Sequence, residues 1–248
     1  MKSMDSFPSQ LESVLNRNGL SAPRFSGWWQ VWSRNGNREG ALLVSRHRIV
    51  SAFPPDLACS RDIPDMTCCV YDEYKEDVDL FMYFGQLEPI LIQAGYDLLD
   101  FIRETKKPLF SRSDIENYYI LEKSPRVTYD GSHPSQTIKA SGHLFILPDG
   151  LEFRSVDYLG KRRWLFLPYN EIKGVQFVMN RVTTLGMMAL AKVTSDRILK
   201  PRLVVATPSR MGDMNNIHFS GPPKLKDWAV RIKQAGIFYK RHIAKYNH

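Results

Sequence analysis

Short stretches in which apolar and polar residues alternate dominate the second half of the chain. A period of two residues is typical of β-strands that bury one face. Asp149-Gly150, between the first two stretches, is a typical two-residue hairpin turn. The alternation predicts strands over 137–147, 151–156, 164–167, 172–178, 203–206 and 217–219.

A different period begins near the C-terminus. From Lys224 onward, apolar residues recur at three- and four-residue intervals and form one helical face: Leu225, Trp228, Ile232, Ala235 and Tyr239. Many short strands followed by one amphipathic helix predict a small β barrel or sandwich that the helix closes at one end.

The first half mixes strand and helix patterns. The aromatic run 28–32 predicts a strand, Asn35-Gly36 a hairpin turn, and 41–52 the returning strand. Residues 53–77 are rich in proline and acidic residues, which predicts a loop with at most one strand, near 67–74. Helix signals occur at 4–18, 88–95, 97–104 and 113–121, whereas 78–84 fits either a strand or a helix.

Together these patterns predict an α+β protein of two domains. A mixed α/β domain of unrecognised family occupies 1–123, and a stretch dense in Pro, Ser and Gly at 124–135 is the predicted linker. The second domain, a β barrel with a closing helix, occupies 136–248. No internal sequence repeat is evident, but duplication of one small β domain stays open.

Composition indicates an ordinary globular chain. Of 248 residues, 43% are hydrophobic and 24% are charged, which excludes a disordered or collagen-like chain. No apolar run is long enough to span a membrane, and the N-terminus lacks the apolar core of a signal peptide, so we expect a cytoplasmic protein. Cys59, Cys68 and Cys69 fit neither a disulfide framework nor a zinc site and are expected to be reduced thiols.

Positive charge is concentrated in the second half. Residues 1–110 hold 12 Lys/Arg and 15 Asp/Glu, a net charge of −3, whereas residues 111–248 hold 22 and 11, a net charge of +11. An anionic partner should therefore meet the second half. The candidate anion-binding residues are Lys161, Arg162 and Arg163, although a solvated basic surface explains the same charges.

An uncharged apolar stretch at 183–191 is a second candidate contact. Leu185, Met187 and Met188 could dock against a membrane interface or a partner if they are exposed. Burial against the barrel or the first domain is the alternative. The stretch is too short to cross a bilayer.

Residues 135–245 resemble the pleckstrin-homology-like superfamily, in particular its GRAM and bacterial branches. The resemblance rests on Phe166-Leu-Pro-Tyr-Asn-Glu-Ile-Lys-Gly-Val175, on the apolar connector 183–190, and on Trp228. Trp228 matches the helix tryptophan that plugs the barrel in pleckstrin-homology domains.

The resemblance implies a module that binds phosphoinositides, other lipids or proteins, usually without catalysis. Lipid-binding members commonly carry basic residues on the first hairpin. This chain departs from that pattern, because its first hairpin loop, 148–150, has no lysine. Its positive cluster lies in the second loop, at 161–163. A nonspecific contact with an anionic surface stays open.

One arrangement suggests chemistry. Asp149 followed by Glu171 and Lys173 resembles the Asp…Glu-x-Lys pattern of metal-dependent nucleases, in which carboxylates hold Mg²⁺. The Asp-Gly hairpin turn explains Asp149 equally well. Phosphate-loop, dinucleotide, zinc-protease and serine-hydrolase motifs are absent, and the six histidines show no metal-ligand spacing. We therefore expect no catalytic residue, no cofactor and no metal.

These observations favour a non-enzymatic docking or adaptor protein that binds a protein partner or, as a peripheral protein, an acidic membrane surface. One alternative is a nucleic-acid-binding protein, with or without Mg²⁺-dependent cleavage. The other is a structural subunit of a larger assembly, with the Trp-rich hairpin and the 239–248 tail at its interfaces. The sequence does not determine the oligomeric state.

Overall fold

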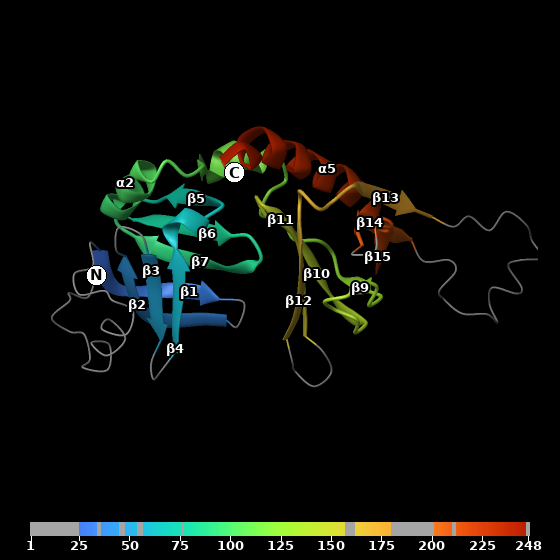
Figure 1. Cartoon of the computed structure of the whole chain (residues 1–248), viewed down its shortest axis with the longest axis horizontal. Coiled ribbons are helices and arrows are strands. Elements are labelled where there is room, and N and C mark those ends of the chain that lie inside the picture. The colour runs from blue at the N-terminus through green and yellow to red at the C-terminus, as the bar shows by residue number, and fades with distance from the viewer. Residues whose placement is uncertain are drawn as a thin grey trace, which may run out of the picture. The chain divides into compact units, whose positions relative to one another are not determined.

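The computed structural model describes residues 25–33, 36–44, 48–53, 57–75, 77–156, 162–179, 201–209 and 212–246. These residues form two compact units, one holding the described residues up to Ile115 and the other Glu116–Ala244 (Figure 1). The helix expected at 4–18, Lys161, and the apolar stretch 183–191 lie outside the described residues.

The first unit is built on an eight-stranded sheet, whose strand order is β4-β3-β2-β1-β7-β6-β5-β8. Neighbouring strands are antiparallel except β5 and β8, which run parallel. Its elements are β1 Phe25–Ser33, β2 Gly36–Val44, β3 Arg48–Phe53, β4 Leu57–Asp62, the 3-10 helix η2 Ile63–Asp65, β5 Cys68–Glu73, β6 Val78–Phe84, β7 Leu87–Ala94, α2 Tyr96–Glu104, β8 Leu109–Ser111 and α3 Arg112–Glu116.

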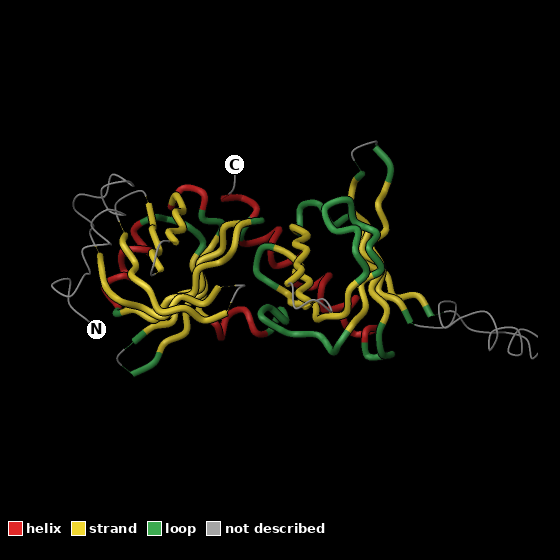
Figure 2. Tube along the Cα trace, turned by 90° about the horizontal axis from the view of Figure 1, so that it is seen from below, coloured by secondary structure: helices red, strands yellow, loops and turns green. Residues whose placement is uncertain are grey.

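The second unit holds a seven-stranded antiparallel sheet in the order β12-β11-β10-β9-β15-β14-β13. Its elements are β9 Val127–Tyr129, β10 Ala140–Ile146, β11 Gly150–Val156, β12 Arg162–Pro168, β13 Gly174–Val178, β14 Arg202–Pro208, β15 Met214–Ser220 and α5 Leu225–His242. The 3-10 helix η3 Ala244–Tyr246 follows α5, and its Lys245 and Tyr246 are grouped with the first unit. Figure 2 traces the strands of both units in yellow and the helices in red.

The two units repeat one topology. Numbered within each unit, the seven strands β1–β7 and β9–β15 both follow the order 4-3-2-1-7-6-5. In both units a helix comes directly after the seventh strand, α2 after β7 and α5 after β15. The duplication that the sequence left open is therefore present in the strand order, although the sequence shows no repeat.

Residues 88–94 lie in strand β7, so the prediction of a helix over 88–95 is wrong. Ile90 and Ile92 of β7 are buried and alternate with half-buried Leu91, as a strand requires. Pro89 lies where the β6–β7 register shifts between Met82 and Phe84, an irregularity that tolerates a residue without an N–H donor. Pro89 before the apolar run of β7 therefore marks a β-bulge and not the start of a helix.

Other elements of the first unit also differ from expectation. The predicted return strand 41–52 is two antiparallel strands, β2 and β3, and the predicted loop 53–77 contains β4 in addition to the expected strand, β5. Residues 78–84, left open between strand and helix, form β6. The helix predicted at 97–104 is confirmed as α2, whereas the one predicted at 113–121 is only the five-residue α3.

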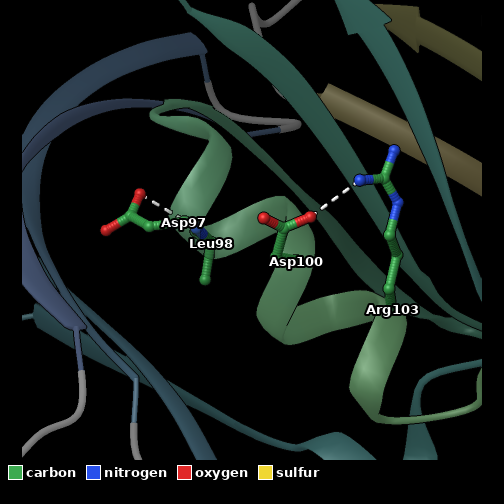
Figure 3. A network of polar contacts seen from close by, with 4 residues as sticks. All are labelled: Asp97, Leu98, Asp100 and Arg103. Atoms are coloured by element: carbon green, nitrogen blue, oxygen red, sulfur yellow. Dashed lines mark hydrogen bonds and ion pairs between the residues drawn. The ribbon is translucent and has the colours of Figure 1, made fainter.

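Helix α2 shows how a short helix is held in place. Its buried residues Leu98, Leu99, Phe101 and Ile102 form one apolar face, and the helix packs near β6. The Asp97 carboxylate accepts a hydrogen bond from the Leu98 N–H at 2.9 Å, and Asp100 pairs with Arg103 at 2.7 Å (Figure 3). Because the Asp100–Arg103 pair is exposed, it adds little stability, and apolar burial holds the helix.

The predicted linker 124–135 contains the central strand of the second sheet. Tyr129 in β9 pairs with Ala140 on one side and with Phe219 on the other. Its ring lies 5.5 Å from the rings of Phe153 and Phe219, in the centre of the core. A strand of three residues is too short to show a period, which is why the sequence pattern missed it.

Helix α5 packs against β13 and β14 and buries Trp228. Strands β12 and β13 end the sheet order, and no ladder joins them among the described residues, so the sheet is open and the predicted closed barrel is not observed. A sheet-rich unit that ends in a helix with a buried tryptophan is consistent with a PH-like fold.

Candidate docking surface on the second unit

Strands β10, β11 and β12 present a distinct outer face, opposite the core. Residues that point inward, such as Leu144, Phe153 and Leu165, are buried. The outward residues form cross-strand rows, because directly paired residues in antiparallel strands lie on one face. One row is His143, Arg154 and Trp164; the second is Phe145, Glu152 and Phe166; the third ends with Val156 and Arg162.

Arg154 is held at the middle of this face. Its guanidinium lies 2.8 Å from the carboxylate of Glu152 and 4.5 Å from the centre of the Phe145 ring. Glu152 is fully buried, so the ion pair is shielded from water on the carboxylate side. A guanidinium fixed by a buried carboxylate and an aromatic ring is preorganised, which lowers the entropy lost when a ligand binds.

Three exposed side chains surround this arginine: Val156, Arg162 and Trp164. Val156 is 59% exposed and Trp164 is 44% exposed, so two large apolar side chains lie on this face together with the arginines. Tryptophan and arginine are the residue types most enriched at the centre of protein interfaces. We call Arg154, Val156, Arg162 and Trp164 the outer-face patch.

The structure separates two of the residues predicted to bind anions. Arg162 is exposed on the outer face, whereas Arg163 pairs with Ser155 on the inward side and is half-buried. Successive residues of a strand point to opposite faces, so adjacency in sequence did not bring these arginines together. A joint contact by residues 161–163 stays a prediction. Within β12, the period of two could have placed Trp164 on the same face as Arg162.

The residues of the nuclease-like pattern are not assembled into a metal site. Asp149 is buried in the β10–β11 hairpin, where its carbonyl accepts a hydrogen bond from the Tyr169 N–H. Glu171 is exposed, and the Lys173 ammonium donates to the Asn170 carbonyl at 3.1 Å. Within the described part of the chain, no three His, Cys, Asp or Glu residues are grouped to hold a metal ion.

Tyr169 is also unsuited to acid–base chemistry near neutral pH. Burial of its ring raises the pKa of the Tyr169 hydroxyl well above 10.0, and the charge of Asp149 raises it further. The ring packs 5.8 Å from that of Tyr239 on α5. Tyr169 therefore serves as a core residue that joins the β12–β13 connection to the helix.

Cys68 and Cys69 are both buried in the core of the first unit. Burial raises the pKa of the Cys69 thiol far above its usual value. A buried thiol that stays protonated is a poor nucleophile and a poor metal ligand.

His133 lies in the turn between β9 and β10. Its Nδ1 atom lies 2.7 Å from the Ser135 hydroxyl and accepts a hydrogen bond from the Ser135 N–H at 3.2 Å. Burial lowers the pKa of His133 below 6.5, and the charge of Glu171 partly opposes this. The folded turn therefore favours the neutral ring.

Acidification is expected to weaken this turn. Because the folded-state pKa of His133 is lower than 6.5, the unfolded chain binds more protons as the pH falls below 6.5, and the free energy of unfolding decreases. NMR titration of the His133 ring should give a pKa below 6.5, and Glu171→Gln should lower it further. A value at or above 6.5 in the wild type would contradict the assignment.

Comparison with known proteins identifies no family. No family model matches the chain, and no curated protein matches it significantly. Among solved structures, the C-terminal domain of an unknown protein from Leishmania infantum is 16% identical, covering 50% of this chain and 93% of that one with a TM-score of 0.28. The Spt16D–Pob3N heterodimer structure is 12% identical, covering 82% and 98%, with a TM-score of 0.32.

Both TM-scores are too low to support a conclusion about this chain. The description of the second unit as an antiparallel sheet followed by a helix therefore rests on its own strand order and on the position of α5. In the described residues, no helix is both long and apolar enough to cross a bilayer.

Proposed function

We propose that this protein is a non-catalytic docking module whose outer-face patch binds an acidic peptide segment of a partner protein. The observation that carries the proposal is the placement of exposed Trp164 and Arg162 on the same face as Arg154, which Glu152 and Phe145 hold in place. An aromatic anchor beside preorganised cations suits a peptide that offers one apolar side chain next to carboxylates.

Charge and burial both support an acidic protein segment as the ligand. The half of the chain that contains the patch has a net charge of +11, which attracts acidic partners. An acidic membrane surface would also engage the arginines and an interfacial tryptophan, so the test below includes vesicles as a separate arm. The apolar stretch predicted to reach a membrane, 183–191, lies outside the described residues.

A displayed library of random 12-residue peptides tests the proposal. We expect the wild-type chain to enrich peptides that combine Asp or Glu with a large apolar residue. Synthetic copies of these peptides should bind the Arg162→Ala/Trp164→Ala variant at least tenfold more weakly in fluorescence anisotropy, because both anchors are lost.

The matched control is Lys139→Ala/Met214→Ala, which removes an exposed cation and an exposed apolar residue elsewhere on the same unit. This control should change affinity less than twofold. The proposal fails if the enriched peptides bind Arg162→Ala/Trp164→Ala as tightly as the wild type. It also fails if no peptide is enriched while vesicles containing 30% phosphatidylserine retain the protein.

A further inference from the structure

The solvent-facing side of α5 carries a stripe in which basic and aliphatic residues alternate. Its members are Lys226, Val230, Lys233, Ile237 and Lys240, separated by four, three, four and three residues. At about 100° per residue, all five lie within an arc of about 80° on the helix surface. The stripe is about 21 Å long, the length of four helical turns.

This stripe is exposed along its whole length. Val230 is 56% and Ile237 is 40% exposed, and the three lysines are exposed as well. The opposite side of α5 holds its buried residues and packs against β13 and β14. Burial in the core therefore explains one face of the helix and leaves the alternating stripe unexplained.

The charge of the stripe is not neutralised by ion pairs among the residues that the structure describes. Helix α5 contains five Lys or Arg residues and one Asp. Arg231 lies beside the stripe and pairs with Glu122, whereas Lys226, Lys233 and Lys240 make no ion pair with any residue that the structure describes. Three lysines in one row attract negative charge at regular intervals.

We propose that this stripe, which we call the α5 seam, docks an acidic amphipathic helix of a partner protein. Alternating steps of four and three residues are the repeat by which two helices pack side by side. In that repeat Val230 and Ile237 occupy one core position, and the lysines occupy the other. A partner helix with apolar residues facing the aliphatic pair and glutamates facing the lysines complements the seam in both shape and charge.

Other ligands fit this seam less well. A helix that lies in a membrane interface uses a continuous apolar face, and on α5 that face is already buried against the sheet. A second copy of α5 would place lysines opposite lysines. A nucleic-acid backbone would satisfy the lysines but would offer phosphates to Val230 and Ile237, which gain nothing from them.

The α5 seam is separate from the outer-face patch, so its test does not depend on the function proposed above. The probe is a synthetic 21-residue helical peptide in which leucine and glutamate alternate at steps of four and three residues, with alanine-rich sequence between them. The leucines occupy the core position that matches Val230 and Ile237, and the glutamates occupy the one that matches the lysines. A scrambled peptide of the same composition lacks the repeat. We expect the full chain to bind the patterned peptide at least tenfold more tightly than the scrambled one, with affinity falling as salt is raised from 50 to 300 mM.

Charge reversal of the seam is the decisive variant. Lys226→Glu/Lys233→Glu/Lys240→Glu should weaken binding of the patterned peptide at least tenfold. The control Lys123→Glu/Lys139→Glu/Lys173→Glu makes the same change in net charge at exposed lysines off the helix and should alter affinity less than threefold. A peptide with lysine in place of each glutamate should bind the seam variant more tightly than it binds the wild type, which also shows that the variant is folded.

Two results would overturn the proposal, and a third would support its apolar part. Equal binding of patterned and scrambled peptides would overturn the proposal, because net charge alone would then explain the attraction. Binding of phosphatidylserine vesicles or of a 20-base-pair duplex that depends on the three lysines, with no peptide binding, would overturn it as well. Loss of peptide binding in Val230→Ser/Ile237→Ser, with the lysines intact, would support the apolar part of the seam.

Discussion

Replacing Gly142 with alanine is expected to lower the free energy of unfolding of the second unit by about 3 kcal/mol. Gly142 lies in β10 between Val127 of β9 and Ser155 of β11. A Cβ atom added there would lie 2.0 Å from the Arg154 carbonyl oxygen and 2.7 Å from the Ser155 Cβ. Because the nearest atom is backbone, no side-chain rotation relieves the clash, and the strands must separate.

Gly236→Ala is the matched control. Gly236 lies within α5, and an added Cβ would make only an ordinary contact, 3.7 Å from the Tyr169 ring. Because alanine favours a helix over glycine, this variant should gain up to about 1 kcal/mol. Urea denaturation measures both, and hydrogen exchange of peptides from β10 and β11 assigns the transition to the second unit. An unchanged midpoint for Gly142→Ala would contradict the close strand packing.

The strands of the second unit could be predicted well from the sequence. Alternation in the sequence identified β10 to β15, although β11 and β12 bury several consecutive residues, and the apolar repeat from Leu225 identified α5. The prediction failed where the local signal was short or ambiguous. Strand β9 has only three residues. Strand β7 has Pro89 near its start, a continuous apolar core and Gly95 directly after its end, a pattern shared by buried strands and buried helices.

The candidate site was less predictable because it depends on pairing across strands. Arg162 was selected from its charge, but its companions Trp164 and Arg154 come from the register of β11 and β12, which the sequence does not specify. Glu152 could not be predicted, since a carboxylate on an outer face is ordinarily solvated and only the tertiary structure buries it. The four- and three-residue spacing of the α5 seam is present in the sequence, but its exposure depends on how the helix packs against the sheet.

Replacing Glu152 with glutamine is expected to cost the second unit about 3 kcal/mol of unfolding free energy. The substitution preserves the shape of the side chain but removes the charge that faces the Arg154 guanidinium, whose side chain is only 21% exposed. Breaking a buried ion pair by removing one charge leaves the other in a poorly solvated place. Asp100→Asn, which breaks the exposed Asp100–Arg103 pair, should cost less than about 1 kcal/mol and serves as the control.

An apolar replacement of both partners separates charge from packing. Glu152→Leu/Arg154→Met removes the ion pair without leaving a lone charge. We therefore expect this double variant to lower the unfolding free energy less than Glu152→Gln does. The same variant should still lose affinity for peptides selected on the outer-face patch, because it lacks the Arg154 guanidinium. Equal destabilisation of the two variants in urea would mean that shape, and not charge, holds Arg154 in place, and the preorganisation attributed to Glu152 would be wrong.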